Sequence, residues 1–379
     1  MDEAGVGEVL IVGAGPVGAV CALALREQGI DARVLEARAE DARSDTRILA
    51  LAYGSRLILE RLGVWARVAD ATAITRIHVS QRGALGVAHL DATDAGVPAL
   101  GYVLPYASLT AALKQALAES SIAVEYGAEV AGVTPGPDAA TLALADGRTL
   151  EAPLVVVADG GREAKPQFTH DYEQVAVVCE VETELPHRNQ AYERFTPDGP
   201  AALLPKGAGY ALVWTARRDD AARIAALDDD AFLDALYRHF GGRQGRFLRA
   251  TPRKTFPLRL AYTKSEAGER VVRIGNAAQT PHPVAGQGFN IGLRDAWELA
   301  SLCGDRPDSL GEASMLAAYA RGRHLDVLGG VGFTDFLVRV FSNDVAPLRH
   351  ARGLGLMALE ALPPLKRFVA RRMIFGARG

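Results

Sequence analysis

Residues 8–18 read EVLIVGAGPVG and decide how the N-terminal part of the chain folds. A short apolar run leads into Gly13, and a run rich in Ala and Leu spans residues 17–28. This order is typical of a strand, a tight turn and a helix. Gly13 permits the turn, Gly15 leaves room for a pyrophosphate, and Gly18 lets the helix pack closely on the strand. Because a helix start offers free N–H groups and the positive end of its dipole, the stretch predicts a phosphate-binding turn.

A carboxylate lies at the end of the second predicted strand, where a dinucleotide-binding unit has one. Ala32–Glu36 is predicted to be the second strand, and Glu36 lies 21 residues after Gly15. At that place a carboxylate accepts hydrogen bonds from ribose hydroxyls. The alternative is a glycine-rich core turn with a surface glutamate. The register of strand, helix and acid favours dinucleotide binding, although it does not separate NAD from FAD.

The remaining chain predicts an α/β fold. Helical patterns cover Ala50–Leu62, Tyr106–Glu119 and Gly288–Cys303, and buried strands are expected at Leu154–Ala158 and Val271–Ile274. A hairpin is expected around the turn dipeptide Asp146-Gly147. From about Tyr172 to Arg259 the alternating pattern indicates an antiparallel sheet, interrupted by one helix near Asp229–Phe240. The tail beyond Leu325 is expected to be mostly helical.

Composition excludes several classes of protein. The chain has 379 residues, of which 49% are hydrophobic and 23% charged, so it is long enough for two or three domains and is not disordered. A net charge of −3 disfavours a general nucleic-acid binder. Three cysteines lie far apart and the eight histidines show no paired ligand spacing, so neither a disulfide scaffold nor a metal site is expected.

Several later segments carry a family resemblance. They are LVVVADG at 154–160, VVRIG at 271–275, NAAQTPHPVAGQGFNIGLRDA at 276–296, DTRILAL at 45–51, and ERFTP at 193–197 with the following residues to Pro205. These segments resemble the class A flavoprotein aromatic hydroxylases, and within them the ubiquinone-biosynthesis hydroxylases. The resemblance runs over most of residues 8–375.

The resemblance implies a para-hydroxybenzoate-hydroxylase-like architecture. A Rossmann-like FAD-binding domain would be assembled from residues 1–75, 100–170 and 268–325. An inserted antiparallel-sheet substrate domain would comprise residues 76–99 and 171–267. Residues 326–379 would form C-terminal helices.

The resemblance also implies the chemistry. FAD would be the bound cofactor and NAD(P)H a transient electron donor, since no separate nicotinamide domain is visible. The reaction with O₂ would form a flavin C4a-hydroperoxide, which hydroxylates the aromatic ring of a polyprenyl phenol in ubiquinone biosynthesis. The alternatives are a class A monooxygenase of a soluble phenol or polyketide, a non-catalytic FAD-binding assembly subunit, and a nicotinamide dehydrogenase.

Candidate site residues follow from the motifs and from the resemblance. We expect Arg47, His282, Pro283 and Gly288 in the environment of the flavin ring, with no base assigned, although His282 is equally compatible with a structural role. The residues expected to bind the cofactor are Gly13, Gly15, Pro16, Val17, Gly18, Glu36, Ala37, Arg38, Arg47, Asp159, Gly160, Gly275, Asn276, Pro283, Gly286, Gln287, Gly288, Phe289 and Asn290.

The chain departs from the family pattern at one flavin contact. The family has Gly-Asp-Ala-Ala-His where this chain has Gly275 to Gln279, so Asn276 replaces an aspartate that accepts a hydrogen bond from the ribitol chain. An amide oxygen still accepts, but without charge assistance. We expect FAD binding to persist, weakened by about 1 kcal/mol. Tyr106 also stands where relatives often have a polar or basic residue.

The C-terminal tail is basic and amphipathic. Residues 339–379 contain eight Lys or Arg and two acids, interleaved with leucines, Met357, Phe368 and Ile374. Such a tail can lie on anionic lipid or form a solvated helix on the FAD domain. Because the N-terminus is acidic, unlike a signal peptide, we expect a cytoplasmic protein, with peripheral contact to the inner face of the membrane. A quinone-biosynthesis complex and a homo-oligomer are also compatible with the resemblance, and nucleic acid is not an expected partner.

Overall fold

The structure is a computed structural model that describes residues 7–42, 45, 47–83, 85–161, 166, 168–262, 270–280, 287–324, 329, 340 and 346–376. Five short strands form a parallel sheet in the order β19-β12-β1-β2-β8. Their bounds are β1 Val9–Val12, β2 Ala32–Glu36, β8 Ala123–Tyr126, β12 Val155–Val157 and β19 Val271–Arg273. Strands from three remote parts of the chain therefore pair in one sheet, and their Val-rich sequences are typical of strands that are covered on both faces.

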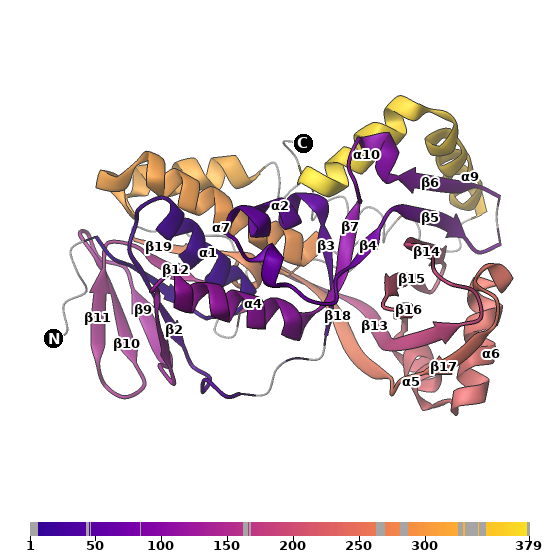
Figure 1. The fold of residues 1–379 in the computed structure, drawn as a ribbon, viewed down its shortest axis with the longest axis horizontal. Helices are drawn as coiled ribbons and strands as arrows, with labels where there is room; N and C mark the ends of the chain where they lie inside the picture. The colour runs from indigo at the N-terminus through magenta and orange to yellow at the C-terminus, as the bar shows by residue number, and fades with distance from the viewer. Residues whose placement is uncertain are drawn as a thin grey trace.

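Period-two alternation gives this sheet two different buried faces. Val9, Ile11 and Val156 face the helices α1 (Pro16–Glu27), α4 (Tyr106–Glu119) and α7 (Gln287–Asp305). Leu10 and Val155 face a three-stranded meander of β9 (Val130–Thr134), β10 (Ala140–Leu144) and β11 (Thr149–Ala152). The parallel sheet is thus the middle layer between helices and meander (Figure 1).

A second, nine-stranded sheet follows the order β20-β18-β13-β16-β15-β14-β5-β6, with β17 paired to β13. The strands are β5 Arg76–Gln81, β6 Val87–Asp91, β13 Phe168–Thr183, β14 Gln190–Thr196, β15 Gly199–Lys206, β16 Gly209–Arg217, β17 Phe247–Ala250, β18 Lys254–Tyr262 and β20 Gln279–Thr280. Strands β5 and β6 come from the N-terminal half and join the sheet through the parallel pairing of β5 with β14. A small antiparallel sheet, β3 (Ile48–Ala52), β7 (Gly101–Pro105) and β4 (Thr72–Ile74), lies between the two larger ones (Figure 1).

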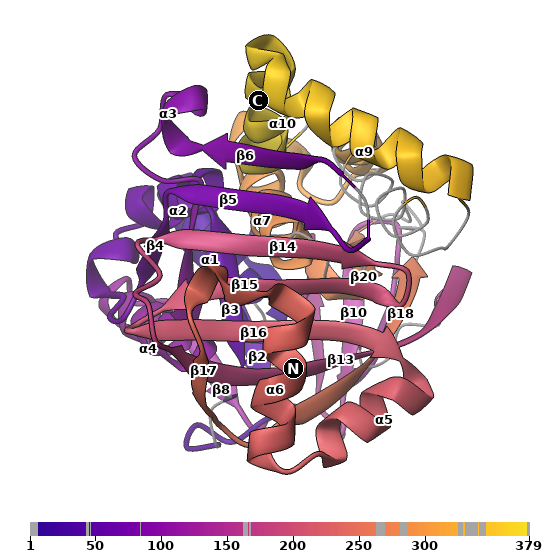
Figure 2. The same ribbon diagram turned by 90° about the vertical axis from the view of Figure 1, so that its right-hand side faces the viewer.

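Helices cover the outer face and one edge of the large sheet. Figure 2 shows α5 (Arg218–Ala226) and α6 (Asp229–Phe240) on the outer face of this sheet. The core between these helices and the sheet contains Tyr210 and Trp214. The C-terminal helices α9 (Ala346–Ala361) and α10 (Pro363–Phe375) lie against β6, α2 (Tyr53–Arg61) and α3 (Ala92–Ala95). Short 3₁₀ turns complete the described elements: η1 Trp65–Arg67, η2 Gly242–Gln244, η3 Gly275–Ala277 and η5 Pro307–Ser309.

The predicted fold class is confirmed, and most predicted elements lie within a residue or two of their observed bounds. The antiparallel pairing of β10 with β11 confirms the hairpin at Asp146-Gly147. The limits of the three predicted domains stay a prediction, although β5 and β6 do pair with the sheet of residues 168–262.

Two element predictions were wrong. The helix predicted over Ala50–Leu62 begins only at Tyr53, because residues 50–52 belong to β3 and pair with the remote strand β7. Instead of one helix there are two, α5 and α6. They are separated by Leu227, whose backbone is extended, and by Asp228, whose carboxylate caps α6 by accepting a hydrogen bond from the Ala231 N–H at 2.8 Å.

The turn between β1 and α1 depends on the close approach of backbone to backbone. Gly13 has φ +104°, and a Cβ at Gly18 would collide with the Gly13 carbonyl oxygen. A Cβ at Gly15 would meet no atom within 4 Å. The first and third glycines are therefore required by packing, whereas the second borders open space.

We predict that Gly18→Ala destabilises the fold by about 1–3 kcal/mol, because the added methyl forces α1 away from the turn. The measurement is thermal unfolding of the cofactor-free protein. Gly15→Ala is the matched control and should leave the midpoint unchanged, since Gly15 already has a φ of −63° that alanine adopts freely. Equal midpoints for both variants would contradict this account of the turn.

Candidate active site

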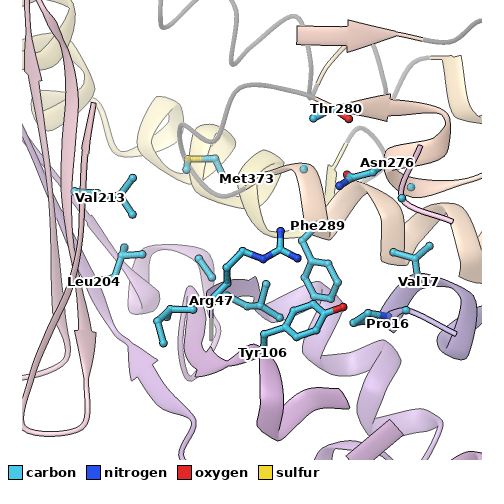
Figure 3. Close-up of a pocket in the computed structure, with 18 of the residues that line it drawn as sticks. Pro16, Val17, Arg47, Tyr106, Leu204, Val213, Asn276, Thr280, Phe289 and Met373 are labelled. Carbon is cyan, nitrogen blue, oxygen red and sulfur yellow. The ribbon is translucent and has the colours of Figure 1, made fainter. Parts of the chain in front are cut away.

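A cavity of about 1500 Å³ lies between the parallel sheet and the large nine-stranded sheet. Its walls come from the loops after β1, β2, β12 and β19, from one face of the large sheet, and from α9 and α10. Figure 3 shows Leu204 and Val213 on one side, Pro16, Val17 and Asn276 on the other, and Arg47 between them. One side of the cavity is therefore built from turns and polar groups, and the other from apolar strand residues.

Glu36 ends β2 and is held in place by four hydrogen bonds. Its carboxylate accepts from the Ala14 N–H at 2.8 Å and the Arg38 N–H at 3.0 Å, and from the Arg38 guanidinium at 2.8 and 3.2 Å. Burial raises the pKa of Glu36, but the hydrogen bonds from Arg38 and Ala14 outweigh it and the net pKa is lowered. The carboxylate is thus ionised beside the turn, and its partner Arg38 is half exposed.

Arg47 is oriented by its neighbours on the loop that leads into β3. The Asp45 carboxylate accepts from the Arg47 Nε at 2.6 Å and from the Arg47 N–H at 2.8 Å. The guanidinium lies 5.2 Å from the centre of the Tyr106 ring, a cation–π distance. Figure 3 shows both side chains in the middle of the cavity, near Phe289. Arg47 is therefore a pre-positioned cation where the two sides of the cavity meet.

The loops after β12 and β19 bring further predicted residues to the cavity. Asp159 follows β12, and its carboxylate accepts from the Gly161 N–H at 2.8 Å in a tight turn. Gly275 follows β19 with φ +60°, and a Cβ there would lie 3.1 Å from the Val17 side chain. Asn276 is exposed to the cavity beside it. The close packing of Gly275 on α1 holds these two loops next to the Gly13 turn.

A buried ion pair supports the Gly275 turn from behind. The Asp295 carboxylate, on α7, accepts from the Gly275 N–H at 3.0 Å and from the Gln279 amide at 2.8 Å, and it pairs with Arg323. Asp295 and Arg323 are 2% and 4% exposed, so this charge pair is removed from water. Gln279, where the family pattern has histidine, therefore has a structural role in this chain.

The N-terminal turn of α7 contributes to both the cavity and the scaffold. Gly288 and Phe289 line the cavity. The side chain of Asn290 is used elsewhere: its oxygen accepts from the Ala52 N–H at 2.7 Å and its nitrogen donates to the Ala50 carbonyl at 3.1 Å. This amide ties α7 to β3 and fixes the direction in which the start of α7 points.

The structure brings most of the predicted site residues to the cavity. Those that line it are Gly13, Gly15, Pro16, Val17, Glu36, Ala37, Arg38, Arg47, Asp159, Gly160, Gly275, Asn276, Gly288 and Phe289. Gly18 and Asn290 are not among the lining residues. Gly18 instead packs α1 on the Gly13 turn, and Asn290 links α7 to β3. His282, Pro283 and Gly286 lie outside the described residues, as does the side chain of Gln287.

Sequence reasoning missed many of the lining residues, among them a charged side chain of the large sheet and several residues of the C-terminal helices. Glu193 lies on the cavity face of β14, a position that strand alternation could have revealed once its neighbours Ala191 and Phe195 were read as one face. Leu356 and Met373, from the C-terminal helices, also line the cavity. No sequence signal places these helices there, because their packing on β6 and α2 is a long-range contact.

Comparison with known proteins identifies this arrangement. The family model described as an FAD binding domain matches residues 7–327. The chain belongs to this FAD-binding family. Over 97% of its length it is 36% identical to "Ubiquinone hydroxylase UbiL" of Rhodospirillum rubrum, covering 89% of that protein. It is also 33% identical to "3-demethoxyubiquinol 3-hydroxylase" of Escherichia coli, covering 95% of this chain and 96% of that protein.

Solved structures of other proteins share the fold. The p-nitrophenol 4-monooxygenase PnpA of Pseudomonas putida superposes with a TM-score of 0.79 at 16% identity, covering 99% of both chains. The predicted resemblance is thus confirmed: the protein is a class A FAD-dependent aromatic hydroxylase related to the ubiquinone hydroxylases.

We predict that Arg323→Met destabilises the fold by about 3–5 kcal/mol, because it leaves the Asp295 carboxylate buried without its cation. Denaturant unfolding measures the change. Arg321→Met, at an exposed position two residues earlier, is the control and should leave the midpoint unchanged. Adding Asp295→Asn to Arg323→Met should recover part of the loss. If the double variant is no more stable than Arg323→Met, the buried charge is not the cause.

Proposed function

We propose that the protein hydroxylates the aromatic ring of a polyprenyl phenol in ubiquinone biosynthesis, using bound FAD, O₂ and NAD(P)H. The observation that carries this proposal is the two-sided cavity. Its volume of about 1500 Å³ exceeds the roughly 300–1,000 Å³ of ordinary small-molecule sites, which allows a cofactor and a large substrate together. The names of the two relatives support the same pathway.

The residues on the polar side fit FAD. Gly13 and Gly15 at the start of α1 would hold the pyrophosphate, since the space beside Gly15 is open and the helix dipole favours an anion. Glu36 would accept ribose hydroxyls in place of the half-exposed Arg38 guanidinium. Arg47, Asn276 and the N-terminus of α7 would surround the flavin end. Once bound and reduced by a transiently bound NAD(P)H, FAD would supply the electrons that activate O₂ for transfer of one oxygen atom.

The protein's own groups orient the reactants and exclude water. The N-terminus of α7 would stabilise negative charge on the reduced cofactor, and Arg47 is held ready by Asp45. The opposite wall consists of apolar side chains of the large sheet and C-terminal helices, among them Val79, Leu204 and Leu356. This wall suits an aromatic ring with an apolar chain and keeps water from the reacting atoms.

We predict that cells lacking this protein accumulate a prenylated phenol short of one oxygen, as measured by mass spectrometry of quinone precursors. The intact gene should restore the quinone. Asn276→Asp should restore it at least as well and hold FAD about fivefold more tightly, because a charged acceptor adds about 1 kcal/mol to a hydrogen bond. An unchanged precursor profile would favour a soluble phenol as substrate. Restoration by a variant that cannot oxidise NAD(P)H would favour a non-catalytic subunit.

We also propose that α9 and α10 contact an anionic membrane surface. Their outer sides expose large apolar residues, with Leu354 66%, Met357 51% and Phe368 65% exposed, next to the exposed Arg367 and Arg371. Their inner sides line the cavity. Among the described residues no helix is long and apolar enough to cross a membrane. Peripheral contact would let a lipid-borne substrate pass from the bilayer into the cavity.

We predict that vesicles containing anionic lipid co-sediment the protein and that Leu354→Ser with Phe368→Ser reduces the bound fraction at least fivefold, since two apolar anchors are lost. Leu248→Ser is the matched control, because Leu248 is 54% exposed but lies on β17 in the large sheet. Equal sedimentation of all three proteins would contradict the proposed contact.

A further inference from the structure

One charged side chain interrupts the apolar wall of the cavity. Glu193 lies on β14, and its cross-strand neighbours are Val79 on β5 and Ala202 on β15. Along β14 the residues on the same face are Ala191 and Phe195, and all five line the cavity. A carboxyl group therefore stands in the middle of a wall that is otherwise suited to apolar ligands.

This carboxyl group has no partner among the described residues: neither a hydrogen bond nor an ion pair reaches it. Burial alone raises its pKa to about 8. The other charged residues of the cavity lie on other walls, none of them on the large sheet: Glu36, Arg38, Arg47, Glu129, Asp159, Arg273 and Arg352. The carboxyl group lines the cavity, so a ligand bound there can complete its hydrogen bonding.

A phenol hydroxyl can donate the hydrogen bond that the Glu193 carboxyl group lacks. Its O–H can donate to the carboxylate while its ring and any prenyl chain lie on the neighbouring apolar side chains. We propose that Glu193 binds the phenol hydroxyl of the substrate and accepts its proton, an inference that rests on the proposed hydroxylase function. A base whose pKa lies near the working pH is the efficient one for such a transfer.

The step is a single proton transfer. The O–H bond of the phenol breaks, its proton forms an O–H bond with the Glu193 carboxylate, and the electron pair stays on the phenol oxygen. The products are a phenolate and a neutral carboxylic acid, so total charge is unchanged. A phenolate gives more electron density to its ortho and para carbons than a phenol does, which activates them for oxygen transfer. When the hydroxylated product leaves, the carboxylic acid returns the proton to its oxygen.

Two substitutions separate binding from proton transfer. Glu193→Gln keeps a hydrogen-bonding group of the same shape but cannot accept a proton. Glu193→Leu removes both abilities and should fold well, because the side chains around it on the cavity wall are apolar. Glu182→Gln is the matched control, since Glu182 is an exposed carboxylate on β13, and it should behave like the wild type.

Binding is measured on the FAD-loaded protein with 2-prenylphenol and with its methyl ether, which lacks the hydroxyl proton. Above pH 8, where Glu193 is ionised, wild type should bind the phenol at least tenfold more tightly than the ether, the size of one charged hydrogen bond. Glu193→Leu should abolish this preference. The thermal midpoint of the wild type should also fall relative to both variants between pH 4.5 and 8, because only the folded state holds the Glu193 proton over that range.

Turnover tests the proton transfer. Wild-type kcat for 2-prenylphenol should rise with pH as Glu193 ionises near pH 8. Glu193→Gln should lose this rise and about a hundredfold of the hydroxylation rate while NAD(P)H oxidation continues, with its electrons released as hydrogen peroxide. If both variants keep the wild-type preference for the phenol and the wild-type pH profile, the inference about Glu193 is wrong and the hydroxylase function stands. If the wild type itself neither binds nor hydroxylates 2-prenylphenol, both proposals are wrong.

Discussion

The parallel pairing of β12 with β1 on one side and with β19 on the other is the contact on which the rest of the site depends. It joins segments that are remote in the chain, and because the strands are parallel their carboxyl ends meet at one edge. The Gly13 turn, Asp159 and the Gly275 turn each follow one of these strands, so the pairing brings them to the same cavity. Ligands of open α/β sheets bind at this edge for the same reason.

Close contacts at small residues fix the positions of the loops at this edge of the sheet. Gly275 packs on Val17, Gly18 packs on Gly13, and Asp295 fixes the Gly275 N–H from behind. These groups do not need to touch the cofactor to matter. They set the spacing between the loops that line the cavity. The buried pair of Asp295 with Arg323 also fixes this spacing, although removing two charges from water costs free energy.

The opposite wall follows a different principle. A sheet face built from Val79, Ala202 and Leu204 can accept an aromatic ring and an apolar chain but offers little direction to either. One carboxyl group in such a wall fixes the orientation of a ligand, because the ligand can form a hydrogen bond with it only where a hydroxyl group reaches the carboxyl group. Its position among these side chains raises its pKa, and perturbed pKa values are common at functional sites.

The local sequence by itself determined the glycine-rich turn after β1, the strands that flank it and the helices α1, α4 and α6, because spacing, capping and apolar periodicity act over a few residues. The family resemblance added the cofactor class and several of the residues that line the cavity, among them Arg47, Asp159 and Asn276. Tertiary structure alone decided that residues 50–52 form a strand, since β3 is stabilised by the remote β7, and that α9 and α10 line the cavity. It also decided that Asn290 holds β3 and that Glu193 stands unpaired among apolar side chains. These features depend on contacts between distant segments, and no pattern within one segment records which distant segment will lie against it.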